Sequence, residues 1–152
     1  MAKLDSTIEI AASPADVFVF FVPQRMAYWY GKEMDGEIDV HCGAPEFCLS
    51  QAVRITGKLG KKEVAHTAVI TRYEWGRLLE WRFEDPYGVR GLERWEIQAV
   101  NGSGFHTRVH MWSEYELPGK LGRAVDWVFT RHAVARRNHE YLARLKKLAE
   151  RA

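Results

Sequence analysis

Residues 3–30, KLDSTIEIAASPADVFVFFVPQRMAYWY, contain the opening elements of the fold. Every second residue from Leu4 to Ile10 suits an inward-facing position, and this alternation predicts a strand. Ser13 is a good N-cap and Pro14 suits the first helical position, so a short helix is expected to begin there. Pro23 ends that helix and begins a second short one. The stretch therefore predicts one strand followed by two short helices.

The centre of the chain carries strand patterns separated by tight turns. Turn residues gather in GKLG, DPYG and NGSG, and such short spacing favours antiparallel hairpins. We expect strands near residues 37–41, 46–57, 62–74, 78–84, 89–100 and 105–117.

Residues 118–151 predict one long helix. A stripe at spacings of three and four is expected to face the sheet: Leu121, Val125, Val128, His132, Ala135, His139 and Leu142. The element order predicts an α+β fold in which a curved, seven-stranded antiparallel sheet wraps around this C-terminal helix. We interpret residues 1–152 as a single domain.

Composition narrows the classes of partner. The chain has 22 basic and 20 acidic residues, well mixed, so it lacks the basic footprint of a nucleic-acid-binding protein. It has no run of 18 apolar residues and no signal-peptide pattern at its start, which favours a cytoplasmic protein without integral membrane association. Nineteen aromatic residues (6 Trp, 6 Tyr and 7 Phe) are enough to fill a core or line a cavity. We expect a monomer or a homodimer.

Several stretches resemble the START-like, or Bet v 1-like, helix-grip superfamily, which includes polyketide cyclase/dehydrase (SRPBCC) proteins. Residues 8–30 look like its opening strand and paired helices, with a small-Pro-x-x-Val-aromatic pattern that begins at Ser13. LLEWRF, RWEIQAVNGSGFHTRVH and ELPGKLGRAVDWVF look like its later strands and last helix. The resemblance implies a cavity between sheet and helix for a hydrophobic or amphipathic small molecule. The superfamily spans lipid carriers, receptors, cyclases and chaperone activators, so the resemblance implies fold more than function.

Residue parity on the later strands predicts which side chains face the cavity. An NGSG turn pairs Ala99 with Thr107, which places Glu93 beside Ser113. A DPYG turn that pairs Phe83 with Val89 places Trp81 beside Gly91, where the glycine would leave space, and Leu79 beside Glu93. The expected ligand-binding residues combine these strands with the helix stripe: Leu79, Trp81, Phe83, Glu93, Trp95, Val109, Met111, Ser113, Val128 and His132.

Glu93 and His132 are the candidate catalytic residues. An inward carboxylate and an inward imidazole can act as acid and base on a bound polyketide-like substrate. Alternatively, Glu93 orients a ligand, bonds Ser113 or a backbone group, or pairs with Arg90 or Arg94, while His132 is a core histidine. The favoured function is binding of a lipid- or polyketide-like molecule. The alternatives are a cyclase, aromatase or dehydrase, and a protein-interaction module of the chaperone-activator type.

Other chemistry-bearing residues give weaker signals. His41, Cys42 and Cys48 supply three ligands where a structural zinc takes four, so we expect no metal. His106 and His110 share a solvated sheet face. No Walker loop or dinucleotide fingerprint occurs, and we expect no cofactor. The AYWY segment, residues 27–30, either forms an aromatic lid or packs its helix to the sheet.

Overall fold

The computed structural model describes residues 2–31, 35–41, 46–59, 62–84, 89–102, 104–116 and 131–151. The strands are β1 (Ala2–Ile10), β2 (Asp35–His41), β3 (Ala52–Leu59), β4 (Lys62–Glu74), β5 (Leu78–Glu84), β6 (Arg90–Ala99) and β7 (Thr107–Glu116). The helices are α1 (Pro14–Phe18), α2 (Pro23–Met26) and α4 (Arg131–Arg151), with a 3₁₀ turn, η1, at Val100–Gly102.

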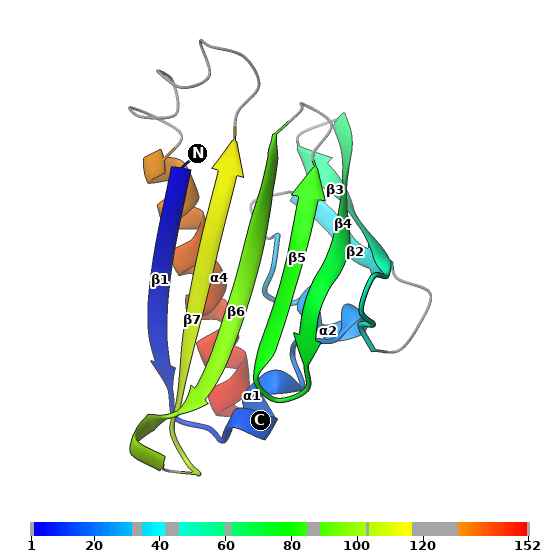
Figure 1. The fold of residues 1–152 in the computed structure, drawn as a ribbon. Coiled ribbons are helices and arrows are strands. Elements are labelled where there is room, and N and C mark those ends of the chain that lie inside the picture. The colour runs from blue at the N-terminus through cyan, green and yellow to red at the C-terminus, as the bar shows by residue number, and fades with distance from the viewer. Residues whose placement is uncertain are drawn as a thin grey trace.

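The strands form one antiparallel sheet in the order β1-β7-β6-β5-β4-β3-β2 (Figure 1). Helix α4 lies along one face and packs against β1, α1 lies beside the C-terminal end of α4, and α2 packs against β2 (Figure 1). Two polar contacts join α4 to the first strand: Lys146 Nζ donates to the Glu9 carbonyl at 2.7 Å, and the Ala11 N–H donates to Glu150 Oε1 at 2.9 Å. The predicted α+β arrangement of an antiparallel sheet and a C-terminal helix is therefore confirmed.

The Ser13 cap forms as predicted, because Ser13 Oγ accepts from the Asp16 N–H at 3.1 Å. Gly31, at φ 76°, takes the left-handed conformation after α2 that glycine adopts without steric cost. Helix α2 itself ends at Met26, earlier than the sequence pattern suggests.

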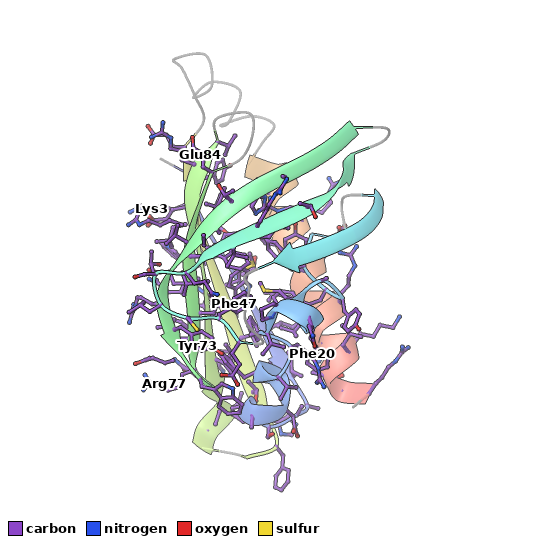
Figure 2. All side chains as sticks on the ribbon, turned by 90° about the vertical axis from the view of Figure 1, so that its right-hand side faces the viewer. Lys3, Phe20, Phe47, Tyr73, Arg77 and Glu84 are labelled. Atoms are coloured by element: carbon purple, nitrogen blue, oxygen red, sulfur yellow. The ribbon has the colours of Figure 1, made fainter. Side chains whose placement is uncertain are left out.

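An aromatic cluster fills the space between the sheet and the short helices. Trp29, Trp81 and Trp95 have no exposed surface, and the rings pack edge to face: Trp81–Trp95 centroids are 5.2 Å apart and Trp29–Trp95 centroids 5.9 Å. Trp29 Nε1 donates to the Phe20 carbonyl at 2.9 Å, which satisfies its buried N–H. Phe47 extends the cluster, with its ring 6.4 Å from that of Tyr73 (Figure 2). Exposed side chains such as Lys3, Arg77 and Glu84 point away from this core (Figure 2).

The strand predicted at 46–57 begins only at Ala52. Ser50 has φ 66°, a left-handed conformation that interrupts an extended chain. On an extended strand from residue 46 to 57, parity would place Leu49 inward with Val53 and Ile55, but Leu49 is 65% exposed. Val53 and Ile55, which lie within β3, are buried.

The β6–β7 register is the predicted one, with Ala99 opposite Thr107 and Glu93 opposite Ser113. The predicted β5–β6 register is wrong by two residues, because Phe83 pairs with Gly91, Trp81 with Glu93 and Leu79 with Trp95. A shift of two keeps every side chain on its predicted face.

Gly91 leaves no space beside Trp81, contrary to the prediction. A Cβ there would lie 2.1 Å from the Glu114 carbonyl oxygen and 2.8 Å from Phe83 Cζ. The position therefore requires glycine because the neighbouring strand and the Phe83 ring approach its backbone closely.

In the described part of α4, the predicted helix stripe is confirmed at Leu142, which is buried, but not at His139. The buried residues are Asn138, Tyr141, Leu142, Leu145 and Ala149, at spacings of three and four. His139, predicted as core or rim, is exposed. Residues 117–130, including Leu121, Val125 and Val128, lie outside the described residues.

Candidate functional site

Glu93 lies on β6, faces the interior and is 1% exposed. The sheet register places Trp81 of β5 and Ser113 of β7 directly beside it. Its Oε1 accepts from Tyr30 Oη at 2.5 Å and from Trp81 Nε1 at 3.0 Å. These donors offset much of the cost of burying a carboxylate, and charge-assisted hydrogen bonds of this kind are among the stronger ones.

Arg137 of α4 is the cationic partner of this carboxylate. Its Nη2 lies 3.5 Å from Glu93 Oε2 and 3.3 Å from Asn138 Oδ1, and its guanidinium carbon lies 5.4 Å from the Tyr141 ring centroid. The predicted pairing of Glu93 with Arg90 or Arg94 is wrong, since both arginines lie on the outer face. There Arg90 pairs with Glu84 at 3.7 Å, and Arg94 pairs with Glu80 at 3.3 Å.

Ser113 connects the same site to the helix. Its Oγ accepts from Asn138 Nδ2 at 2.9 Å, and both residues are buried. An asparagine inside a helix interface is stable only when its amide is satisfied, and this bond supplies one partner. Glu93, Arg137, Asn138 and Ser113 thus form one polar chain from β6 across α4 to β7.

The surroundings of Tyr30 keep its hydroxyl protonated, so that it can donate a hydrogen bond. Burial raises the pKa of the Tyr30 hydroxyl well above its usual value of 10.0, and the negative charge of Glu93 raises it further. The hydroxyl therefore stays protonated and keeps its proton directed at the carboxylate.

A pocket of about 210 Å³ opens between the sheet and α4 beside this carboxylate. Its wall mixes apolar and polar groups: Tyr30, His66, Phe83, Val89, Glu93, Ser113, Glu114, Tyr115, Val134 and Arg137. His66, which the sequence left unassigned, shares a face of β4 with the buried Ala68 and Ile70. Its ring centroid lies 5.8 Å from that of Phe83 and 6.4 Å from that of Tyr30.

Only some of the expected ligand-binding residues line this pocket. Phe83, Glu93 and Ser113 do so. The others in the described part of the sheet are fully buried in the hydrophobic core: Leu79, Trp81, Trp95, Val109 and Met111. Val128 lies outside the described residues, and the structure describes the backbone of His132 in α4 but not its side chain.

Sequence reasoning missed His66 and Arg137 as site residues, and it considered Tyr30 only as part of the AYWY segment. Trp29 and Tyr30 are buried and therefore pack their segment against the sheet, whereas Tyr28 is 60% exposed. Arg137 belongs to the polar run Arg136–Arg137–Asn138, and no periodic pattern marks which of the three faces the sheet. What distinguishes Arg137 is its contact with the buried Glu93 of β6, which the local sequence does not reveal.

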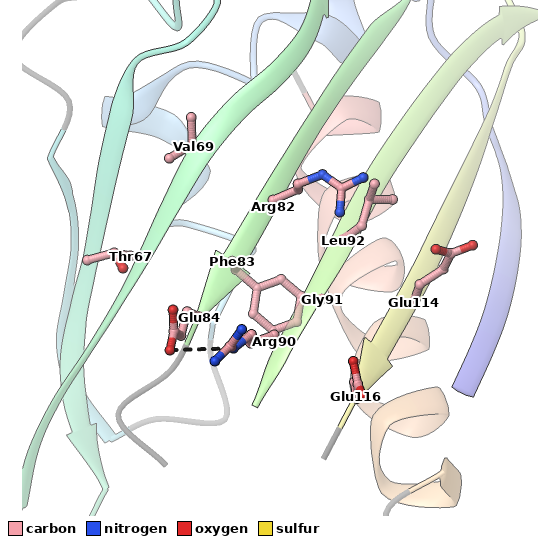
Figure 3. A pocket seen from close by; sticks show the side chains of 10 residues that line it. All are labelled: Thr67, Val69, Arg82, Phe83, Glu84, Arg90, Gly91, Leu92, Glu114 and Glu116. Carbon is pink, nitrogen blue, oxygen red and sulfur yellow. Dashed lines mark ion pairs between the residues drawn. The ribbon is translucent and has the colours of Figure 1, made fainter. Parts of the chain in front are cut away.

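A larger hollow of about 380 Å³ lies on the outer face of the sheet (Figure 3). Most of its wall is charged or half-exposed, including Arg82, Glu114 and Glu116, and Arg90 pairs with Glu84 across one end (Figure 3). It has no fixed buried polar group comparable with Glu93. The inner pocket is therefore the better candidate ligand site.

Cys48 is an exposed free thiol, whereas Cys42 and the side chain of His41 lie outside the described residues. His110 Nε2 lies 3.5 Å from Asp5 Oδ2 on the outer sheet face. Across the described ranges, no three His, Cys, Asp or Glu side chains gather as metal ligands would, and no helix there is long and apolar enough to cross a membrane.

A family model described as polyketide cyclase / dehydrase and lipid transport matches residues 1–150. The chain belongs to this family. Membership confirms the resemblance to the START-like helix-grip superfamily that the sequence motifs indicated. The members of such a family share a fold and differ in ligand, so membership alone does not assign an activity.

Solved structures support the fold of this polyketide cyclase/dehydrase family member. A Chromobacterium violaceum protein is 12% identical over 99% of both chains, with a TM-score of 0.73. A Rhodobacter sphaeroides protein is 18% identical over 96% of this chain and 90% of its own, with a TM-score of 0.71. DynU16, from the dynemicin biosynthetic locus, is 17% identical over 97% of this chain and 47% of its own, with a TM-score of 0.67. No curated protein matches the chain.

Proposed function

We propose that this protein binds a small hydrophobic or amphipathic organic molecule, lipid- or polyketide-like, in the inner pocket. The observation that carries the proposal is the fixed carboxylate of Glu93 in the wall of a hollow that also contains Phe83, Val89 and Val134. Ligand sites commonly combine an apolar lining with a few positioned polar groups. The family description, which names both lipid transport and polyketide chemistry, supports the same reading.

The pocket volume limits the size of the ligand. A volume of 210 Å³ corresponds to about seven water molecules at roughly 30 Å³ each. That space suits one ring or a short chain. A longer molecule would have to extend beyond the described wall.

The decisive experiment is native mass spectrometry of the protein purified from its own host, followed by identification of any retained molecule. A Val134→Trp variant places an indole in the pocket wall and should abolish retention. The matched control is Arg136→Trp, which puts the same side chain on an exposed position of the same helix. The control should retain the molecule.

Two outcomes contradict the proposal. If both tryptophan variants retain the molecule as the parent protein does, the inner pocket is not its site. If neither the purified protein nor a reconstituted sample binds any small amphipathic molecule, the binding function itself is wrong.

A second candidate function is a cyclase, aromatase or dehydrase reaction with Glu93 and His132 as acid and base. The placement of Glu93 in the pocket wall and the cyclase/dehydrase part of the family description favour it. The donors around Glu93 favour orientation over proton transfer, because Oε1 already accepts two hydrogen bonds. Turnover assays on Glu93→Gln and His132→Ala separate the two functions. Unchanged turnover in both variants would refute the enzymatic role of this pair.

The protein-interaction alternative predicts a different result. A stoichiometric partner recovered by pull-down would still bind the Val134→Trp variant, because filling the pocket leaves the outer surface unchanged. Loss of the partner on pocket filling would contradict this alternative.

A further inference from the structure

We propose that the inner pocket selects an uncharged ligand whose polar end donates a hydrogen bond, such as a phenol or an alcohol, and rejects a carboxylate. The inference rests on the proposed function, since it requires a ligand in that pocket. It assigns to Glu93 the role of the specificity-determining residue.

The pocket offers acceptor atoms at its polar end. Glu93 Oε1 already accepts from Tyr30 Oη and Trp81 Nε1. Among the described residues, Glu93 Oε2 contacts Arg137 Nη2 alone, and that contact of 3.5 Å is long for a hydrogen bond. A carboxylate oxygen accepts about two hydrogen bonds, so Oε2 retains capacity for a ligand donor.

Tyr30 adds a second acceptor to the same end of the pocket. The Tyr30 proton is directed at Glu93, so toward a ligand the Tyr30 oxygen can act only as a hydrogen-bond acceptor. A ligand hydroxyl therefore finds two oxygens that accept. A ligand carboxylate, which carries no donor, finds none that it can satisfy at these two residues.

The charge balance points the same way. Arg137 Nη2 already contacts Glu93 Oε2 and Asn138 Oδ1, and the guanidinium lies over the Tyr141 ring. The positive charge of the Arg137 guanidinium thus balances the negative charge of the Glu93 carboxylate. A second carboxylate would add an unbalanced negative charge in a largely desolvated space, which is unfavourable.

Two other ionisable side chains, Glu114 and His66, line the pocket. Glu114 lines the pocket, but its carboxylate accepts from Trp112 Nε1 at 3.2 Å and lies 3.8 Å from Lys3 Nζ on the outer face. The His66 ring packs against the Phe83 ring, with the centroids 5.8 Å apart. All affinities should be compared at a single pH.

The apolar wall fits the rest of such a molecule. Phe83, Val89 and Val134 contribute no polar side-chain atoms, and Tyr30 lines the same space. A single aromatic ring fits a volume equal to about seven water molecules. The inferred ligand class is therefore a small hydroxylated aromatic or aliphatic molecule.

The test compares three probes of nearly equal size by titration calorimetry or ligand-observed NMR: 4-ethylphenol, 4-ethyltoluene and 4-ethylbenzoate. They differ only in a donor hydroxyl, a methyl and a carboxylate. A hydrogen bond to a charged acceptor should make 4-ethylphenol bind about tenfold more tightly than 4-ethyltoluene. We expect 4-ethylbenzoate to bind at least about tenfold more weakly than 4-ethylphenol.

Glu93→Gln should remove this selectivity, because the amide is uncharged and also offers a donor. The advantage of 4-ethylphenol should shrink, and 4-ethylbenzoate should bind more tightly than it does to the parent protein. Glu96→Gln is the matched control, on the same strand but on the outer face, and should leave the order of the probes unchanged.

The outcomes distinguish this inference from the proposed function. If no probe binds the parent protein, the pocket-binding function fails. If all three bind equally, or if 4-ethylbenzoate binds most tightly, the pocket binds ligands but the inferred selectivity is wrong. The order of the probes on the parent protein decides this point even if Glu93→Gln does not fold.

Discussion

Replacing Tyr30 by phenylalanine tests the network that holds the Glu93 carboxylate. The substitution keeps the ring, whose centroid lies 4.8 Å from that of Tyr141 and 5.4 Å from that of Trp81, and removes only the hydroxyl. It therefore deletes the 2.5 Å hydrogen bond to Glu93 Oε1 with little change in packing.

The expected loss follows from what remains around the carboxylate. Hydrogen bonds to charged groups contribute about 1.5–3 kcal/mol. Trp81 Nε1 stays at 3.0 Å and Arg137 Nη2 at 3.5 Å, so Glu93 is not orphaned. The cost should stay below the roughly 3–5 kcal/mol of a broken buried ion pair. At about 2–4 °C for each kcal/mol, the midpoint of thermal unfolding should fall by roughly 3–12 °C.

Urea or thermal unfolding followed by circular dichroism measures this loss. The matched control is Tyr28→Phe, because Tyr28 is 60% exposed and surface substitutions usually change stability by less than about 0.5 kcal/mol. A double-mutant cycle of Tyr30→Phe with Glu93→Gln should show that the two effects are coupled. If Tyr30→Phe costs no more than Tyr28→Phe, the hydroxyl does not hold a buried carboxylate and the reasoning is refuted.

Three further predictions concern pH, sheet packing and the first helix. The pKa of Tyr30 is raised above 10.0 in the folded protein, so the native state keeps a proton that the unfolded state loses, and this contribution to stability is full below about pH 10 and falls above it. In alkaline unfolding titrations, the stability of Tyr30→Phe should fall less steeply than that of the parent protein, by up to about 1.4 kcal/mol per pH unit. Identical slopes would exclude this linkage. Gly91→Ala should destabilise by about 1–3 kcal/mol in urea, since the new Cβ meets the Glu114 carbonyl oxygen at 2.1 Å, and an unchanged midpoint would show that the strands approach less closely. Ser13→Ala should cost about 1 kcal/mol through loss of the α1 cap, whereas Ser13→Asp should retain most of the stability; equal losses would argue against capping.

Sequence patterns predicted faces better than registers. Trp81, Glu93 and Trp95 all face inward as their parity requires, because one face of the sheet packs against helices and the other meets water. The β5–β6 register was wrong by two residues because such a shift leaves every face unchanged, so parity carries no information about it. The β6–β7 register was right, since both parity and the NGSG turn constrain it.

The helix phase shows where hydrophobic periodicity fails. Asn138 is 1% exposed although asparagine is usually a surface residue, because Ser113 on β7 satisfies its amide. The prediction instead placed His139 inward, and the structure exposes it. A polar residue that is buried because of a partner far along the chain has no signature in the helix itself. The assignment of His132 rested on the same predicted phase and stays a prediction.

Glu93 was identified as the polar group of the inner face, but its partners were not. Parity alone places a carboxylate inside, whereas Tyr30 and Arg137 reach it from α2's end and from α4 across 63 and 44 residues of chain. Contacts of that sequence separation depend on the angle between helix and sheet. That angle follows from how the whole core packs, so local patterns did not predict it.

The most direct test of the central claim, that a small molecule binds beside Glu93, is an NMR titration with 4-ethylphenol that follows the six tryptophan indole N–H signals. The Trp81 indole N–H donates to Glu93 Oε1, so its resonance should shift in a saturable manner as the pocket fills. Trp75, which is 53% exposed at the β4–β5 turn, should not shift. Absence of a saturable shift at Trp81, or shifts confined to Trp75, would contradict the account.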